Sequence, residues 1–318
     1  MDQTNLTVGD FTLKHRAVSI DHLKELQADI DRLESEGKIS HNEIFRGYIS
    51  NKQFRIPKDF SDAKSLIIIA AFTKPMLVNF HFDRGEHEVM LPPSYYDDGL
   101  TEEMLRDYII EEVVNEPGHR IERAKLHLKL LAVRSGLGKY GRNNLCYVEG
   151  MGSMLALYAF FTDYACEDSW TEVNMMDSCK NCRTCMNNCP NKCISEENFV
   201  INASRCLSLF NEIKGEFPEW IQPDAHNALM GCLRCQWCCP ANREVIKQAG
   251  RLEDVTAEET RKILSGTPDK ELLNSLSRKL KGYYPTQTEE NFPVFTRNLG
   301  VLLRPDTEKR ALSECVSE

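Results

Sequence analysis

Several features that mark other classes of protein are scarce in this chain of 318 residues. It has no run of about 18 apolar residues that could cross a membrane. Its first residues, MDQTNLTVGDFTLKHR, lack the apolar centre of a secretory signal peptide. We recognise no low-complexity tract and no internal repeat. We therefore expect a cytoplasmic protein with no membrane partner, whose thiols stay reduced.

Positive charge is also in short supply. The chain has 39 Lys and Arg against 48 Asp and Glu, which gives a net charge of -9. A phosphate backbone is held by a basic surface, so this balance argues against a general nucleic-acid binder, although a local basic patch could still contact a structured RNA. The composition, 42% hydrophobic and 27% charged, is typical of a globular protein large enough for two domains.

Cysteine, in contrast, is abundant, with 13 residues. Cys179 opens a C-x2-C-x2-C-x3-C-P run that ends at Pro190, and Cys232 opens a C-x2-C-x3-C-P run that ends at Pro240. Runs of the first type bind iron–sulfur clusters, and their fourth cysteine ligates a second cluster. A zinc site would instead need two separated Cys-x2-Cys pairs. The spacing therefore predicts two 4Fe-4S clusters and electron transfer.

The ligand count leaves one cysteine over, because two cubane clusters need eight thiolates and nine are available. Cys238 is the one we leave out, since it and its neighbour Cys239 would otherwise have to serve two separate clusters. Cys206 could alternatively be a buried helix thiol. The predicted ligands are Cys179, Cys182, Cys185 and Cys239 for one cluster, and Cys189, Cys206, Cys232 and Cys235 for the other. We interpret the other five as apolar fillers or surface thiols, namely Cys146, Cys166, Cys193, Cys238 and Cys315.

The residues before the clusters are too many for a ferredoxin. Apolar periodicity predicts helices at 19–36, 101–118 and 124–136, and strands at 65–72, 145–150 and 153–163. The strand at 65–72, SLIIIAAF, is apolar throughout, as a strand buried on both faces would be. We therefore expect an α+β fold with three parts: a mixed domain over 1–165, a cluster domain over 166–250 and a helical extension over 251–318.

A glycine-rich stretch at 136–144, GLGKYGRNN, matches the G-x-G-x-x-G pattern of dinucleotide sites. The match is misleading, because a Rossmann loop follows a strand and opens a helix, whereas this one follows a predicted helix and leads into a strand. Its backbone N–H groups, with Lys139 and Arg142, could hold an anionic part of a cofactor such as a phosphate. The alternative is a tight turn with two solvated cations.

The stretch LKLLAVRSGLGKYGRNNLCYVEGMGSMLALYAFFTD, followed by the two cysteine runs and Arg205-Cys206, resembles the superfamily of epoxyqueuosine reductases and corrinoid reductive dehalogenases. The resemblance covers about residues 60–245. It implies a nitroreductase-like α/β sandwich domain that binds cobalamin and a ferredoxin-like domain that carries two 4Fe-4S clusters.

The resemblance also implies site residues. Those expected beside the corrinoid are Gly136, Gly138, Lys139, Gly141, Arg142 and Asn143, with Gly152 and Ser153 in a later loop. The position of the reductases' catalytic acid falls on Glu122, although Lys125 replaces the proline expected after it. The dehalogenases use a tyrosine instead, for which the candidates are Tyr95, Tyr96 and, in the loop itself, Tyr140.

We therefore expect a reductase that takes electrons from a low-potential donor such as ferredoxin or flavodoxin. They would pass through the clusters to cobalamin, and the substrate would be a small molecule or a corrinoid protein. We do not expect tRNA as a partner, because the helical-repeat extension that grips it in epoxyqueuosine reductases is not recognised here. A non-catalytic electron carrier and a reductive activator of a corrinoid protein are the alternatives.

Overall fold

The computed structural model describes residues 6–8, 10–52, 54–197 and 199–303. Within this part the chain forms two compact units, each assembled from segments that are separate in the sequence. Unit 1 combines the described residues up to Phe72 with those of 99–182 and 196–204, and unit 2 combines those of 73–98, 183–195 and 205–303. The three consecutive domains predicted above stay a prediction.

Unit 1 is built on a five-stranded sheet with the order β1-β2-β3-β9-β6, in which every neighbouring pair is antiparallel. Its central strand is the predicted apolar run, and Ile68 of that strand lies opposite Arg16 on one side and Ala159 on the other. The strands are β1 (Leu6–Val8), β2 (Phe11–Ser19), β3 (Ser65–Phe72), β6 (Ile121–Arg123) and β9 (Leu155–Thr162).

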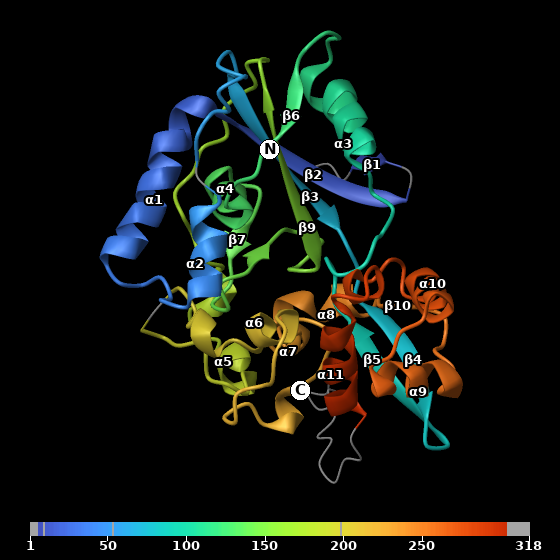
Figure 1. Ribbon diagram of the computed structural model, residues 1–318. Helices are drawn as coiled ribbons and strands as arrows, with labels where there is room; N and C mark the ends of the chain where they lie inside the picture. The colour runs from blue at the N-terminus through green and yellow to red at the C-terminus, as the bar shows by residue number, and fades with distance from the viewer. Residues whose placement is uncertain (1–5, 9, 53, 198, 304–318) are drawn as a thin grey trace. The chain divides into compact units, whose positions relative to one another are not determined.

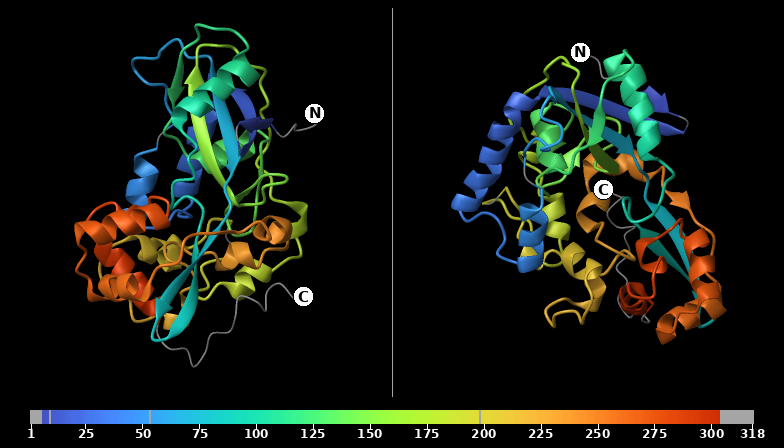
Figure 2. Two further views of the ribbon diagram at one scale, coloured as in Figure 1. Left: turned by 90° about the vertical axis from the view of Figure 1, so that its right-hand side faces the viewer. Right: turned by 45° about the horizontal axis from the view of Figure 1, so that its top comes forward.

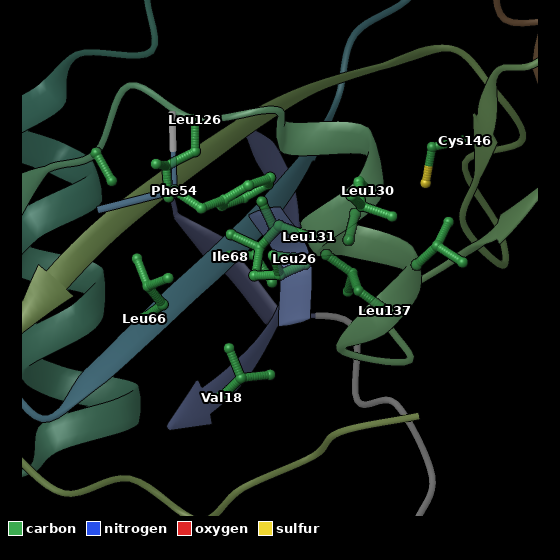
Figure 3. Packing of buried hydrophobic residues seen from close by; sticks show 14 of the residues in the cluster. Val18, Leu26, Phe54, Leu66, Ile68, Leu126, Leu130, Leu131, Leu137 and Cys146 are labelled. Atoms are coloured by element: carbon green, nitrogen blue, oxygen red, sulfur yellow. The ribbon is translucent and has the colours of Figure 1, made fainter. Parts of the chain in front are cut away.

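Both faces of this sheet are covered, which explains why β3 is apolar throughout. Alternate side chains of a strand point to opposite faces. Leu66 and Ile68 pack in one core cluster with α1 (Leu23–Ser35) and α4 (Leu128–Arg134). Ile67 and Ile69 pack in another with α3 (Glu102–Ile109). Figure 1 shows these helices on opposite sides of the sheet, and Figure 3 shows the first cluster from close by.

The helices of unit 1 begin and end where their caps are. The first predicted helix starts later than residue 19, because Ser19 ends β2 and its hydroxyl caps a short 3-10 turn before α1. Thr101 caps α3, which widens into a π-helical turn over Ile110–Val114 and stops before Pro117, as predicted. The helix α4 ends before Gly136, whose φ of +72° is a left-handed conformation that suits glycine.

Unit 2 has its own three-stranded sheet, in the order β10-β4-β5. The hairpin of β4 (Met76–Phe82) and β5 (Gly85–Leu91) was not predicted from the sequence. It shares a core with the predicted C-terminal helices, through Phe80 of β4, Ile263 and Phe295 among others. Figure 2 shows these helices beside the hairpin. The remaining elements of this core are β10 (Gly250–Arg251), α9 (Ala257–Ser265), α10 (Lys270–Lys279) and α11 (Phe292–Leu302).

The other elements are short. They are α2 (Glu43–Ser50), β7 (Lys139–Tyr140), β8 (Cys146–Tyr147), α5 (Thr184–Asn188), α6 (Leu207–Glu212), α7 (Arg234–Trp237) and α8 (Arg243–Ile246). The mixture of helices and strands confirms the predicted α+β class, whereas the nitroreductase-like and ferredoxin-like descriptions stay predictions. In the described part of the chain, every helix is too short or too polar to span a membrane.

Candidate functional site

Four of the predicted cluster ligands lie within unit 2 as one group. Cys189 caps the C-terminus of α5, Cys206 precedes α6, and Cys232 and Cys235 lie before and within α7. Burial raises the pKa of Cys235 well above its usual range, and the neighbouring thiols Cys232, Cys206, Cys185 and Cys189 raise it further. The structure therefore brings Cys235 close to the other three thiols predicted for the second cluster, and also to Cys185, which was predicted for the first.

The thiols do not form a single-ion site. Among the described residues, no three Cys, His, Asp or Glu side chains already enclose one metal position. A cubane needs a different arrangement, since its four thiolates surround a whole cluster. All-thiol ligation also suits iron–sulfur chemistry, so the donor set fits the predicted group.

The ligands predicted for the first cluster are divided between the units. Cys179 and Cys182 belong to unit 1, whereas Cys185 and Cys239 belong to unit 2. Their assignment to one cluster stays a prediction.

A fifth thiol lies in the unit 2 group, and the sequence analysis missed it. Cys193 is buried, and its Sγ lies 3.3 Å from Cys189 Sγ, to which its backbone N–H also donates at 3.4 Å. It hydrogen-bonds Cys206 as well, and these contacts lower the pKa of both Cys189 and Cys206. In the sequence, the signal for this contact is the position of Cys193, four residues after Cys189. Its interpretation as a plain filler is therefore incomplete, while Cys146 does pack as a filler in the unit 1 core.

Two of the remaining cysteines lie in the described part of the chain. Cys238 is buried, and its thiol faces the Thr184 carbonyl at 3.9 Å. Cys166 is half-buried, and its backbone N–H donates to Ser65. Cys315 lies outside the described residues.

The glycine-rich loop holds the first cysteine run through Arg142. Its guanidinium donates from Nε to the carbonyl of Cys182 at 3.0 Å, and from Nη2 to the carbonyls of Cys179 at 2.6 Å and Lys180 at 3.2 Å. The neighbouring strand β7 adds backbone bonds, from Tyr140 N to the Asn174 carbonyl and from Met176 N to the Tyr140 carbonyl. Arg142 therefore positions the cysteine run rather than lying free in a solvated turn.

The glycines of this loop are explained by close packing inside unit 1. A Cβ at Gly138 would lie 2.6 Å from Cys146 Sγ and 2.7 Å from the Tyr147 carbonyl oxygen. A Cβ at Gly141 would lie 2.4 Å from Tyr147 Cε2. The spaces that glycine leaves are thus filled by the strand β8.

The N–H groups of the loop are engaged as well. Those of Gly136, Gly138 and Gly141 donate to the carbonyls of Val133, Ala132 and Leu145 at 3.0, 3.1 and 2.8 Å. An anion would need these donors. These three N–H groups close a helix end and a hairpin, so the predicted phosphate-holding role would fall to other groups of the loop and stays a prediction.

The other residues predicted beside the corrinoid lie in the same part of unit 1. Asn143 is buried, and its amide donates to the Tyr147 hydroxyl at 2.9 Å. Gly152 is buried with its carbonyl accepting from Val148 N, and Ser153 is half-buried next to it. Lys139 is exposed. Of this set, Lys139 is thus the side chain that the described surface offers most openly.

The two predicted proton donors are in contrasting places. Tyr140 lies in the main core of unit 1, where burial raises the pKa of its phenol. Glu122 is on β6, opposite Phe161 near the end of β9, and its carboxylate forms an ion pair with Arg120.

Glu122 is also far along the sheet from the loop of Gly152 and Ser153. That loop precedes Leu155, the first residue of β9, which is six residues from Phe161. At about 3.3 Å per residue the separation is about 20 Å. The structure therefore does not bring Glu122 to Gly152 and Ser153, and its ion pair with Arg120 favours a structural role.

Comparison with known proteins identifies the cluster region first. Residues 178–242 match the family described as the 4Fe-4S double cluster binding domain, which includes both cysteine runs. The chain is also similar to part of each of several curated enzymes. The chain is 33% identical over 138 residues to the epoxyqueuosine reductase of Aliivibrio fischeri, a match that covers 42% of this chain and 36% of that protein. Over this part, the chain is similar to epoxyqueuosine reductases.

A second such relative gives the same result. The epoxyqueuosine reductase of Cellulophaga algicola is 31% identical over 142 residues, which cover 44% of this chain and 45% of that protein. Both matches span less than half of the relative's length. The resemblance predicted from the motifs is thus confirmed, together with a domain for two 4Fe-4S clusters.

The fold is also that of solved epoxyqueuosine reductases. The structure from Bacillus subtilis, whose catalytic loop is swung out of the active site, has a TM-score of 0.60 at 20% identity, covering 91% of this chain and 77% of that one. The structure of an epoxyqueuosine reductase with an epoxyqueuosine-modified tRNA stem loop has a TM-score of 0.61 at 21% identity, with 91% and 76% covered.

The second of these structures contradicts the prediction that excluded tRNA as a partner. A protein with this fold holds a tRNA stem loop. The prediction relied on the net charge of the whole chain, which is an average, whereas an RNA contacts only part of a surface. It also relied on an extension that was not recognised in the sequence, and the similarity to the tRNA-bound enzyme covers 76% of that chain.

Proposed function

We propose that this protein is an iron–sulfur oxidoreductase that acts on a modified nucleoside of tRNA, as an epoxyqueuosine reductase does. The observation that carries the proposal is the double cluster domain, with four predicted thiol ligands grouped in unit 2. The similarity to epoxyqueuosine reductases in sequence and fold supports the substrate class. A low-potential donor such as ferredoxin or flavodoxin would supply the electrons.

In the proposed reaction the chain's own residues hold the segments that would carry the clusters. Reductive cleavage of a C–O bond takes two electrons and requires protons for the oxygen that leaves. 4Fe-4S clusters held by the predicted cysteines would supply one electron at a time, so two transfers would be needed for each turnover. Arg142 holds the carbonyls of Cys179 and Cys182, which fixes one end of the path.

Cobalamin is the finer part of the proposal and is supported by the family resemblance. When bound, a corrinoid supplies a strongly reducing, nucleophilic metal. The N–H groups of Gly136, Gly138 and Gly141 are engaged within unit 1, so they are not available to hold an anionic part of it. We therefore propose electron transfer as far as the clusters.

The deciding experiment measures iron and cobalt in the anaerobically purified full chain, expressed with cobalamin supplied, and then turnover. We expect about eight iron atoms per chain and conversion of epoxyqueuosine in a tRNA stem loop when reductant is added. A variant with Cys232→Ser serves as a matched control and should lose about half of the iron and all conversion. If the unaltered protein still converts epoxyqueuosine in the stem loop when it holds no iron, the proposal is contradicted.

A non-catalytic electron carrier is the second candidate, and one observation favours it. The N–H groups of Gly136, Gly138 and Gly141 are used within unit 1, so the loop has fewer donors to offer a cofactor's anion than its sequence indicates. About eight iron atoms without cobalt, and no conversion of the stem loop, would favour the carrier. Cobalt at about one per chain with conversion would favour the reductase.

A further inference from the structure

The thiol group of unit 2 has one more member than a cluster needs. A 4Fe-4S cluster takes four thiolates, and Cys193 makes a fifth beside Cys189, Cys206, Cys232 and Cys235. It is 6% exposed, and its sulfur contacts two of the four predicted ligands. A plain apolar filler would pack against carbon, so this position requires an explanation of its own.

The backbone places Cys193 beside the sulfur of Cys189 rather than across a cluster from it. The segment turns back after Cys189, with Lys192 N donating to the Cys189 carbonyl at 3.2 Å. Cys193 N then donates to Cys189 Sγ at 3.4 Å, and the two sulfurs are 3.3 Å apart. Thiolates on different iron atoms of a cubane are held apart by the cluster between them. Two sulfurs in direct contact therefore suit a ligand and its hydrogen-bond donor.

We propose that Cys193 is not a ligand of the second cluster but a thiol that donates hydrogen bonds to its ligand sulfurs. Its backbone N–H donates to Cys189, and its S–H is shared between Cys189 and Cys206. Hydrogen bonds to the sulfurs draw electron density from a cluster and raise its reduction potential. With Cys193 in place, this cluster is therefore easier to reduce than it would be with an apolar residue at this position.

The proposal rests on the cluster assignment within the proposed function, but it makes a separate prediction about potential. The test uses the full chain with reconstituted clusters, and it measures iron content and both midpoint potentials in a redox titration followed by EPR. The variants are Cys193→Ala, which removes the S–H and keeps the backbone N–H, and Cys193→Ser, which keeps a donor. Cys206→Ala is the control for a true ligand, and Cys146→Ala is the control for loss of a buried thiol in the unit 1 core.

We expect Cys193→Ala to keep about eight iron atoms per chain and to shift one of the two midpoint potentials to a more negative value. Cys193→Ser should recover most of that shift, Cys146→Ala should show none, and Cys206→Ala should lose about half of the iron. Loss of about half of the iron from both Cys193 variants would overturn the proposal, because Cys193 would then be a ligand. Unchanged potentials in Cys193→Ala would overturn it too. Failure of the unaltered protein to hold iron would instead overturn the proposed function.

Discussion

Arg142 illustrates how one side chain can connect two motifs that are separate in the sequence. It belongs to the glycine-rich stretch, yet its hydrogen bonds reach the carbonyls of Cys179 and Cys182. A guanidinium presents several donors in a fixed plane, which is why it can hold several carbonyls at once. The cation predicted to bind a cofactor thus acts on the cluster-bearing backbone.

Replacing Arg142 by Lys should weaken this arrangement while the charge is kept. An ammonium cannot reproduce the planar set of donors, so we expect the free energy of unfolding to fall by about 1–2 kcal/mol. We also expect faster loss of iron to a chelator. Lys139→Gln is the matched control, since it removes an exposed cation of the same loop. Equal rates of iron loss from Arg142→Lys and the unaltered protein would contradict the assigned role.

Glu122 provides a second test at the scale of a residue. Its pairing with Arg120 and its distance from Gly152 along β9 favour a structural role. We expect Glu122→Gln to keep most of the turnover and to lose less than about 1 kcal/mol of stability, as is usual for a partly exposed ion pair. Arg120→Gln, which breaks the same pair from the other side, should cost a similar amount. Complete loss of turnover with intact cluster spectra would instead identify Glu122 as the proton donor.

At the scale of elements, α9 and α10 of unit 2 are joined by a partly buried ion pair. Lys279 Nζ lies 2.7 Å from Glu259, and the two side chains are 10% and 16% exposed. Glu259 also completes a capping box with Thr256 at the start of α9 and accepts from Ser275 of α10. Burial alone would raise the pKa of Glu259, but the hydrogen bonds from Lys279, Ser275 and Thr256 outweigh it and lower the pKa to about 2.

This shift predicts how stability depends on pH. The folded-state pKa of Glu259 is below its ordinary value of about 4.3, so its contribution is present above that value and is lost as the pH falls toward about 2. We expect Glu259→Gln to be less stable than the unaltered protein by about 3 kcal/mol at pH 7. The difference should shrink in denaturant titrations between about pH 4 and pH 2. A difference that does not change over this range would contradict the assignment.

At the scale of the molecule, the sheet of unit 1 and the thiol-bearing segments of unit 2 should respond differently when iron is removed. The strand β3 is buried on both faces by apolar helices. The segments with the unit 2 thiols have helices of four to six residues, α5, α6 and α7, which are too short to be stable by themselves. We therefore expect metal ligation to hold these segments in place.

Removal of iron by a chelator should raise amide hydrogen exchange in 183–195 and 205–242 by at least about tenfold. Protection of β3 should stay within a factor of about two, and this strand serves as the internal control. Mass spectrometry of peptic fragments would resolve both segments. Equal protection of 183–195 with and without iron would show that its fold does not depend on the clusters.

Much of the architecture is a property of local sequence. The apolar run SLIIIAAF predicted a doubly covered strand, because side-chain alternation and burial on both faces leave no position for a polar residue. Cap residues such as Thr101 and Gly136 fixed where helices begin and end. The spacing of the cysteine runs predicted two 4Fe-4S clusters, and the match to the double cluster domain agrees.

Other features depend on contacts between residues far apart in the chain, and only the tertiary structure decided them. The hairpin β4–β5 joins the C-terminal helices because their apolar faces cover one another, which no local pattern encodes. The donors of Arg142 are used for carbonyls some 40 residues away in the chain. The sequence by itself predicted which cysteines bind the clusters. Tertiary packing decided that Cys193 lies against two of them, because a thiol's neighbours depend on how turns and helices from separate segments are brought together.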